Sequence, residues 1–242
     1  MRNEIGIIVY APELVANDDR PLAVVRGMER AFPGLRLDWT ISDEGQLVPL
    51  PQRDAWVMGG EKDGPGVPLV CNGGDSSGRV TLWGARLPAR FAPGRKEQFD
   101  FHVDLPHNAA GVAAAPDVLE AVAEAARAFW GECTPFNPAV DIVSHPLRRG
   151  LPQLKDPQDL RSPEVPWRLG WLSYWSAATA RVIGFPDPAR DAELLSRARH
   201  TTSGGWVVQL TGEPLDLDRP AHLDALKRAY ERFPEIGGRS AR

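Results

Sequence analysis

The sequence predicts an α+β fold, with a mixed or mainly antiparallel sheet and amphipathic helices packed on it. Three observations support this prediction. Short apolar or alternating segments typical of strands recur along the 242 residues, amphipathic segments with helical spacing lie between them, and 23 prolines and 23 glycines interrupt both. A hydrophobic content of 43% and a charged content of 25% are ordinary for a globular chain, which at this length buries a large core.

The N-terminal elements are predicted in the order strand, helix, strand. Residues 5–10 are apolar and rich in β-branched side chains, which is typical of a buried central strand. Apolar residues then recur at helical spacing over 22–32, and the dipeptide Pro33-Gly34 ends that helix. Apolar and polar residues alternate over 35–41, as they do in a half-buried strand.

The middle of the chain is expected to be less regular. Residues 43–78 contain many prolines and glycines, so only short strands near 67–71 are expected there. Residues 80–85 and 99–105 predict two strands, joined by a long hairpin connection. Pro116 is then expected to open an amphipathic helix, because proline suits the first turn of a helix.

A proline-rich stretch separates this helix from the last elements. Residues 134–167 hold seven prolines, a density that excludes a continuous helix or a central strand, so we expect a long crossing or a linker. After it, a strand is expected within 169–175, and short helices are expected at 177–183 and 190–200.

The C-terminal stretch has the clearest pattern. Residues 206–211 predict a strand, and an amphipathic helix follows the tripeptide Asp218-Arg219-Pro220, in which Asp218 is expected to cap the helix. The same tripeptide, Asp19-Arg20-Pro21, opens the first predicted helix. Two explanations stay open: convergent use of good helix-starting residues, or duplication of a β-α unit.

The proline-rich stretch also suggests how the chain is divided. It predicts an N-terminal α+β lobe over 1–133, a connection over 134–167 and a C-terminal α+β lobe over 168–242, with one continuous domain as the alternative.

Charge and cysteine content bound the partners and the compartment. The net charge of −4 argues against nucleic-acid binding, which needs a basic face, but it permits a basic protein partner. Cys71 and Cys133 lie far apart without a metal-binding spacing, which fits a reducing compartment. The N-terminal apolar run is too short for a signal sequence or a membrane span. We therefore expect a cytoplasmic protein without a membrane partner.

The motifs of common enzymes are absent from the sequence. It has no Gly-x-Ser-x-Gly elbow, no His-Glu-x-x-His, no phosphate-binding Gly-Lys-Ser/Thr loop and no Glu-x-Lys of a nuclease core. We therefore expect no enzyme, no cofactor and no metal. An enzyme of unknown type that uses His102, Glu213, Asp216 or Asp218 is the alternative.

From Gly170 onward the chain has two tryptophan-containing segments, an acidic turn and an amphipathic helix. These are Gly170-Trp171-Leu172 with Tyr174, residues 205–211, Pro214, residues 216–220, and Leu223, Leu226 and Tyr230. On these residues the chain resembles the immunity protein 52 family, α+β proteins of bacterial polymorphic toxin systems. The whole chain, including the opening strand and the segment from Asp19-Arg20-Pro21 to Ile41, also resembles a related group of uncharacterised proteins of similar length.

The resemblance implies a function in binding. Members of the family look like partners of nuclease toxins with a restriction-endonuclease-like domain, in which the toxin carries the catalytic carboxylates and the immunity protein blocks them. An interaction or structural protein without a toxin partner is the alternative. An inhibitor needs aromatic anchors and carboxylates that complement a basic cleft. The candidates for these roles are Asp18, Asp19, Asp216 and Asp218 as carboxylates, and Trp171, Tyr174 and Trp175 as anchors, with core packing as the alternative for the aromatics.

Overall fold

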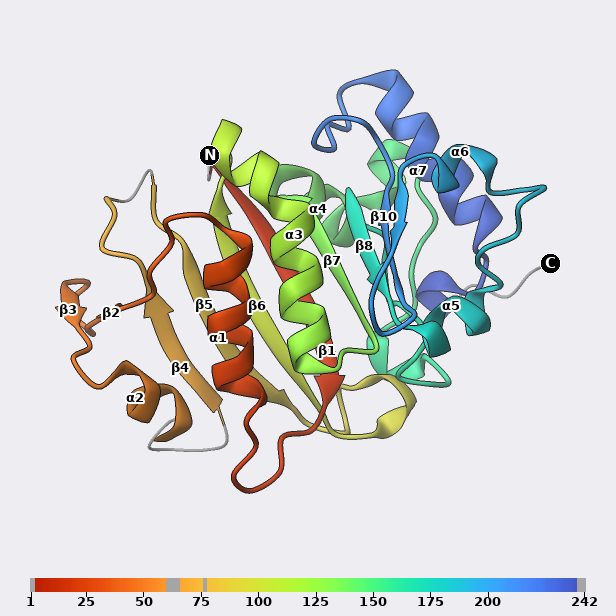
Figure 1. Ribbon diagram of the computed structural model, residues 1–242. Helices are drawn as coiled ribbons and strands as arrows, with labels where there is room; N and C mark the ends of the chain where they lie inside the picture. Colours follow the sequence, from red (N-terminus) through yellow and green to blue (C-terminus); the bar gives the residue numbers. More distant parts are fainter. Residues whose placement is uncertain (1–2, 60–65, 76–77, 239–242) are drawn as a thin grey trace.

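Residues 3–59, 66–75 and 78–238 are described by the computed structural model, and within them ten strands form one antiparallel sheet (Figure 1). The strand order is β3-β2-β4-β5-β6-β1-β7-β8-β10-β9. The strands are β1 (Glu4–Pro12), β2 (Trp39–Ile41), β3 (Leu47–Pro49), β4 (Gly66–Cys71), β5 (Thr81–Leu87), β6 (Gln98–Pro106), β7 (Trp130–Pro135), β8 (Leu172–Trp175), β9 (Ala198–His200) and β10 (Trp206–Gln209).

Helices cover the two faces of this sheet unequally. Helices α1 and α3 lie side by side over one face of the central strands, while α5, α6 and α7 gather around the C-terminal strands (Figure 1). The expected α+β class with a mainly antiparallel sheet is confirmed. The helices are α1 (Arg20–Ala31), α2 (Arg53–Gly59), α3 (Ala109–Ala126), α4 (Phe136–Ser144), α5 (Ala177–Ile183), α6 (Ala192–Leu195) and α7 (Pro220–Arg232).

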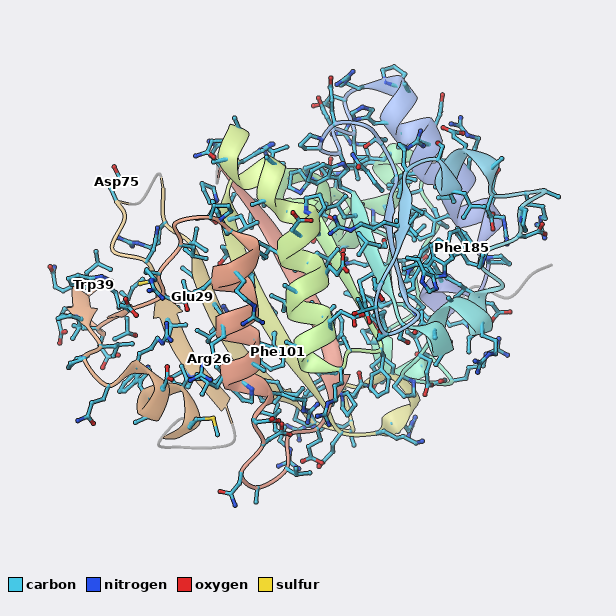
Figure 2. The ribbon with its side chains drawn as sticks, in the orientation of Figure 1. Arg26, Glu29, Trp39, Asp75, Phe101 and Phe185 are labelled. Carbon is cyan, nitrogen blue, oxygen red and sulfur yellow. The ribbon has the colours of Figure 1, made fainter. Side chains whose placement is uncertain are left out.

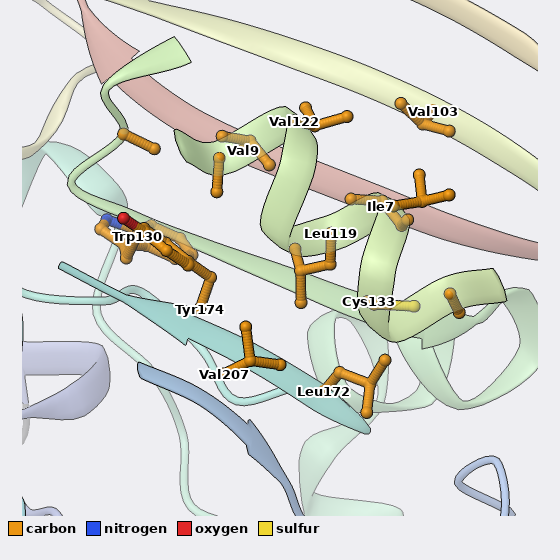
Figure 3. Packing of buried hydrophobic residues seen from close by; sticks show 14 of the residues in the cluster. Ile7, Val9, Val103, Leu119, Val122, Trp130, Cys133, Leu172, Tyr174 and Val207 are labelled. Atoms are coloured by element: carbon orange, nitrogen blue, oxygen red, sulfur yellow. The ribbon is translucent and has the colours of Figure 1, made fainter. Parts of the chain in front are cut away.

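Strand β1 is central, as predicted. It pairs with β6 along one edge and with β7 along the other. Its side chains alternate between the two faces: Ile5, Ile7 and Val9 are fully buried, and the residues between them are only partly buried. Figure 3 shows Ile7 and Val9 close to Leu119 and Val122 of α3. The core beneath α1 and α3 therefore depends on one face of β1.

Arg20 ties together three segments at the end of β1. Its guanidinium donates to both oxygens of the Asp18 carboxylate, the shortest contact being 2.6 Å. It also donates to the carbonyls of Pro12 (2.9 Å), Glu13 (2.7 Å) and Ala126 (3.2 Å). Arg20 is only 6% exposed, and these bonds satisfy its buried donors. We call Asp18 and Arg20 the clamp, because they join the end of β1 to α1 and α3.

The strand expected over 35–41 is shorter in the structure, where only β2 forms. The Leu37 backbone N–H donates to the Glu29 carboxylate of α1 (3.0 Å), so it is not available to a neighbouring strand. Arg53 of α2 donates to the same carboxylate (2.5 Å). Figure 2 shows Glu29 and Arg26 on α1, and Arg26 pairs with Asp54 at 2.6 Å. These contacts hold α2, which sequence patterning did not predict.

The stretch 43–78 is more regular than expected, since it contains β3, α2 and β4. Residues 60–65 and 76–77 of that stretch lie outside the described residues. The expectation of short strands near 67–71 is confirmed by β4, and the two strands joined by a long connection are β5 and β6.

Pro116 does not open a helix, contrary to our expectation. Helix α3 begins earlier, where the Asn108 side chain accepts a hydrogen bond from the Gly111 N–H (3.0 Å). A Cβ atom at Gly111 would lie 2.0 Å from the Pro106 carbonyl oxygen, so this tight start needs glycine. Pro116 then removes one hydrogen bond from the helix interior, which tertiary packing offsets. Strand β7, also not predicted, follows the helix.

The proline-rich stretch 134–167 forms no continuous helix, as expected, but it contains the short helix α4, which was not predicted. Pro138 is the third residue of α4, where a backbone N–H would have no partner within the helix, so proline is tolerated. The stretch connects β7 to β8, and these two strands pair directly. One sheet therefore runs through both predicted lobes.

The C-terminal elements follow the prediction closely. The helix α5, the strand β10 and the helix α7 form where they were expected, and the helix expected over 190–200 is divided into α6 and β9. The capping role expected for Asp218 is wrong, because Arg219 is the N-cap residue of α7 and no side chain caps that helix. Asp19 is the N-cap residue of α1, again without a side-chain capping bond.

We predict that Asp18→Asn lowers the free energy of unfolding by roughly 1–3 kcal/mol at pH 7, because Arg20 loses a charged acceptor. Hydrogen bonds from Arg20 lower the pKa of Asp18 from 3.8 to about 2. Because the folded-state pKa is the lower one, the stabilisation is present above about pH 4 and is lost as the pH falls through about 2. Urea unfolding at several pH values should therefore show the two proteins converging at low pH.

The matched control is Asp117→Asn, which removes a carboxylate from an exposed pair with Arg199. It should change the free energy of unfolding by less than about 1 kcal/mol. A difference between wild type and Asp18→Asn that stays constant from pH 7 to pH 2 would contradict the clamp.

Candidate functional site

Helix α4 lies between two hollows in the surface. The first, of about 670 Å³, lies between the start of α4 and residues 213–219; we call it the acidic hollow. The second, of about 460 Å³, lies between α4 and the face of β5, β6 and β1 that α1 and α3 do not cover; we call it the α4 groove. Glu4 and Phe136 line both hollows, so the two form one continuous surface.

The acidic hollow carries more negative than positive charge. Five carboxylates line it, but only two guanidinium groups, Arg149 and Arg219. The carboxylates are those of Glu4, Asp141, Glu213, Asp216 and Asp218. A surface of this charge attracts cationic groups.

The sequence-predicted residues Asp216 and Asp218 both lie in this hollow. Arg149 bridges Asp218 (2.7 Å) and Asp141 (2.8 Å), and the Asp218 side chain is still 80% exposed. Asp216 accepts the backbone N–H of Asp218 (3.0 Å) and pairs with no lysine or arginine among the described residues. A hydrogen bond from Arg219 lowers the pKa of Glu213. The turn therefore presents several solvent-accessible carboxylates.

The floor of the α4 groove is aromatic and polar. The rings of Trp83 and His102 stack with their centroids 3.9 Å apart and their planes within 3°. His102 Nε2 lies 3.2 Å from the Asp100 carboxylate, and the Thr81 hydroxyl donates to Asp104 (3.0 Å). The His102–Asp100 pair orients an imidazole at this face, a geometry that suits acid–base chemistry as well as binding.

The wall of the groove beside β7 is a buried ion pair. Glu132 and Arg168 form a salt bridge, and both side chains are largely buried. Next to it, Tyr10 stacks on Trp130 with ring centroids 4.1 Å apart, and burial raises the pKa of Tyr10. The pair neutralises its own charges, so it adds no net charge to the groove.

Two buried polar atoms near the groove have no hydrogen-bond partner among the described residues. They are Asp100 Oδ1 and Trp130 Nε1, and Tyr10 lies opposite both residues in the sheet register. Unsatisfied buried groups are uncommon and are often found near functional sites. No sequence motif indicated either atom.

The three aromatic anchors expected from the sequence are not on the surface. Trp171, Tyr174 and Trp175 are each 2% exposed. The Trp171 indole donates to the Thr211 carbonyl (3.0 Å), and the Tyr174 hydroxyl donates to Glu124 (2.8 Å). The expectation that they contact a partner is therefore corrected: their large side chains pack in the core, and the polar atoms of Trp171 and Tyr174 are satisfied there.

Asp18 and Asp19 are not part of this surface. Asp18 is held by Arg20 in the clamp and its side chain is 8% exposed, so it is not available to a partner. Asp19 is exposed at the start of α1. Both follow the Pro12 end of β1, whereas Glu4, at the other end, borders the acidic hollow. The two ends of this strand lie roughly 25 Å apart. The structure thus separates this pair from Asp216 and Asp218.

Sequence reasoning missed the contribution of α4. Phe136, Val140, Val143 and Leu147 follow one another at intervals of four, three and four residues, which is helical spacing. This signal was available, but the proline density drew attention only to the absence of a continuous helix. Of the groove residues on β5, β6 and β7, His102 was named from the sequence as a candidate enzyme residue, and the structure places it on the groove floor beside Trp83. The other residues come from separate segments and carry no motif.

Neither a metal centre nor a spanning helix is seen in the described part of the chain. Among residues 3–59, 66–75 and 78–238, no three His, Cys, Asp or Glu side chains are placed to hold a metal ion together. Over the same ranges, no helix has both the length and the apolar character needed to cross a bilayer.

Comparisons with known proteins identify a family and a shared fold. A family model described as "Domain of unknown function (DUF5953)" matches residues 16–241. No curated protein matches the sequence. Among solved structures, the chain is similar to "Pseudomonas aeruginosa T6SS protein PA0821", with 15% identity and a TM-score of 0.58, over 95% of this chain and 72% of that one. At this identity the similarity shows a common fold.

We predict that Glu132→Leu lowers the free energy of unfolding by about 3–5 kcal/mol, because it leaves the Arg168 guanidinium buried without its partner. The double variant Glu132→Leu/Arg168→Met should recover most of this loss, since two apolar side chains can replace a buried ion pair. Urea unfolding of both single variants and the double variant gives the coupling energy.

The control for this cycle is Glu193→Leu, which breaks an exposed pair with Arg197 and should cost less than about 1 kcal/mol. Strictly additive effects at Glu132 and Arg168 would show that the two side chains are not coupled.

Proposed function

The chain belongs to the DUF5953 family, a domain of unknown function, and we propose that it is an immunity protein. In this proposal it binds a cognate nuclease-type toxin, which has a restriction-endonuclease-like domain, and occludes the toxin's active site. It acts by binding and needs no catalysis of its own.

The observation that carries the proposal is the exposed carboxylate set of the acidic hollow. A nuclease binds phosphates with a basic cleft, and carboxylates placed in that cleft replace the phosphates. Asp216, Asp218 and Glu213 project from one turn, so they can enter a cleft together. The turn is anchored to the core, since Leu215 and Leu217 are buried. A rigid turn loses little conformational entropy on binding.

Two similarities add support. The segments over 170–175 and 205–220 resemble the immunity protein 52 family, and in the structure they form β8, β10 and the turn of the acidic hollow. The solved structure with the same fold is named as a T6SS protein, which is compatible with a protein associated with a secretion system.

A second candidate is an enzyme of unknown type. The specific observation in its favour is the His102–Asp100 pair in the α4 groove, at 3.2 Å. His102→Ala would abolish such an activity, whereas Asp216→Lys/Asp218→Lys would weaken toxin binding and leave that activity intact, so assays of both variants separate the two functions.

The decisive experiment is co-expression with the toxin-like product of a neighbouring gene, followed by co-purification and a nuclease assay. We predict a stable complex in which nuclease activity is silenced. Asp216→Lys/Asp218→Lys should weaken the complex by about 100-fold or more, because two attractive charges become repulsive in a basic cleft. Binding is measured by titration at low and high salt.

The matched control is Asp43→Lys/Glu44→Lys, which makes the same change of charge at an exposed turn between β2 and β3. It should leave the affinity within about threefold of wild type, because only long-range electrostatics change. If wild type forms no complex and gives no protection, the proposal fails. Equal weakening by both double variants would mean that net charge alone, and not the acidic hollow, governs binding.

A further inference from the structure

Helix α4 presents an apolar face that the described part of the chain does not cover. Of its nine residues only Ile142 is buried. Val140 and Val143 are 37% and 38% exposed, and Leu147, just beyond the helix, is 73% exposed. Amphipathic helices normally bury their apolar stripe against a core. An exposed stripe of this kind, beside a hollow, is typical of a surface that contacts another molecule.

The α4 groove lies directly against this stripe. Val140 and Val143 form one side of the groove, and Ile8 and the flat Trp83–His102 stack form its floor. Its volume of about 460 Å³ accommodates one large apolar side chain with its neighbours. The groove therefore offers apolar contact on two sides to a residue that enters from solvent.

The charges around the groove select its ligand. Glu4 and Asp104 line it, and neither forms an ion pair with a lysine or arginine in the described ranges. The charge of Glu132 is neutralised by Arg168, so Glu132 adds no net negative charge to the groove. An apolar hollow with unneutralised carboxylates at its edge favours an apolar side chain that has a cationic neighbour.

We infer that the α4 groove is a docking site for a basic segment of a partner protein, in which an apolar residue fills the groove and a flanking lysine or arginine reaches Glu4 and Asp104. The identification of that partner as the toxin rests on the proposed function, whereas the chemistry of the groove does not. The groove adjoins the acidic hollow through Glu4 and Phe136, so one partner can occupy both.

A second copy of this chain is a less suitable occupant. A symmetric pair would bring Glu4 and Asp104 of one copy towards the same carboxylates of the other, and the whole chain carries a net charge of −4. Self-association is therefore to be tested by sedimentation of the free protein. A dimer that dissociates when Val140→Asp is introduced would overturn the inference.

The direct test uses two blocked tetrapeptides as probes, acetyl-Lys-Phe-Leu-Lys-amide and acetyl-Glu-Phe-Leu-Glu-amide, added to the full chain. The readout is the indole N–H signal of Trp83 in proton–nitrogen NMR spectra, assigned with Trp83→Phe. The signal of Trp56, an exposed residue on α2, serves as the internal reference. We predict a saturable shift of the Trp83 signal with the basic peptide, in the low-millimolar range, and a much smaller shift with the acidic one.

Matched variants connect the shift to the groove. Val140→Asp/Val143→Asp should abolish it, because two carboxylates then occupy the apolar side, and Glu4→Gln should weaken it about two- to fivefold. The control Val15→Asp/Val182→Asp alters two exposed valines elsewhere and should leave the shift unchanged. No shift of Trp83 in wild type, or equal shifts with both peptides, would overturn the inference.

The toxin complex separates this inference from the proposed function. If Val140→Asp/Val143→Asp still captures the toxin with wild-type affinity, the groove lies outside the interface and the inference fails, while the function stands. If wild type captures no toxin but the basic peptide still shifts the Trp83 signal, the function fails and the groove chemistry stands. Loss of toxin capture by this variant but not by the Val15/Val182 control supports both.

Discussion

The rest of the structure depends on the pairing of β1 on both edges. Its backbone joins β6 to β7, and so links the strands formed before α3 to those formed after it. One face of the strand supplies Ile5, Ile7 and Val9 to the core, and the other supplies part of the α4 groove. Glu4, the first residue of β1, borders the acidic hollow, and the carbonyl of Pro12, its last residue, accepts a hydrogen bond from Arg20 of the clamp. Because successive side chains of a strand point to opposite faces of the sheet, β1 contributes both to the core and to the surface.

The candidate site exists because the second face of the sheet is only partly covered. Helices α1 and α3, of twelve and eighteen residues, cover the first face of the central strands, whereas α4 has nine residues and covers less. The surface left between α4 and the strands becomes the groove, and the turn before α7 closes the hollow beside it. Apolar side chains of α4 that would be buried in a larger domain therefore meet solvent next to unneutralised carboxylates. Such a combination suits a partner that is basic and partly apolar.

Local sequence patterns were sufficient to predict the elements whose formation depends mainly on their own residues. The run over 5–10 gave β1, and helical spacing gave α1, α5 and α7. They were not sufficient where a distant contact decides the outcome. Leu37 is not part of the predicted strand, because its backbone N–H donates to the Glu29 carboxylate. Helix α4 forms despite nearby prolines, because Pro138 lies in its first turn. In the candidate site, the acidic turn and His102 were visible in the sequence, but the groove as a whole was not, since its residues come from separate strands.

The tripeptide Asp-Arg-Pro shows the division between sequence and tertiary structure. By itself it determined that a helix begins, and helices do begin there in both cases, because proline favours the first turn. Only the tertiary structure decided what the charges do. Arg20 meets three backbone carbonyls and Asp18, so it is buried and structural, whereas Arg219 pairs with Glu213 in solvent beside an open hollow. The reason is physical: a guanidinium can be buried only where the fold supplies enough acceptors. For Arg20, nearby Asp18, Pro12 and Glu13 supply most of them, and the Ala126 carbonyl, 106 residues away, completes the set.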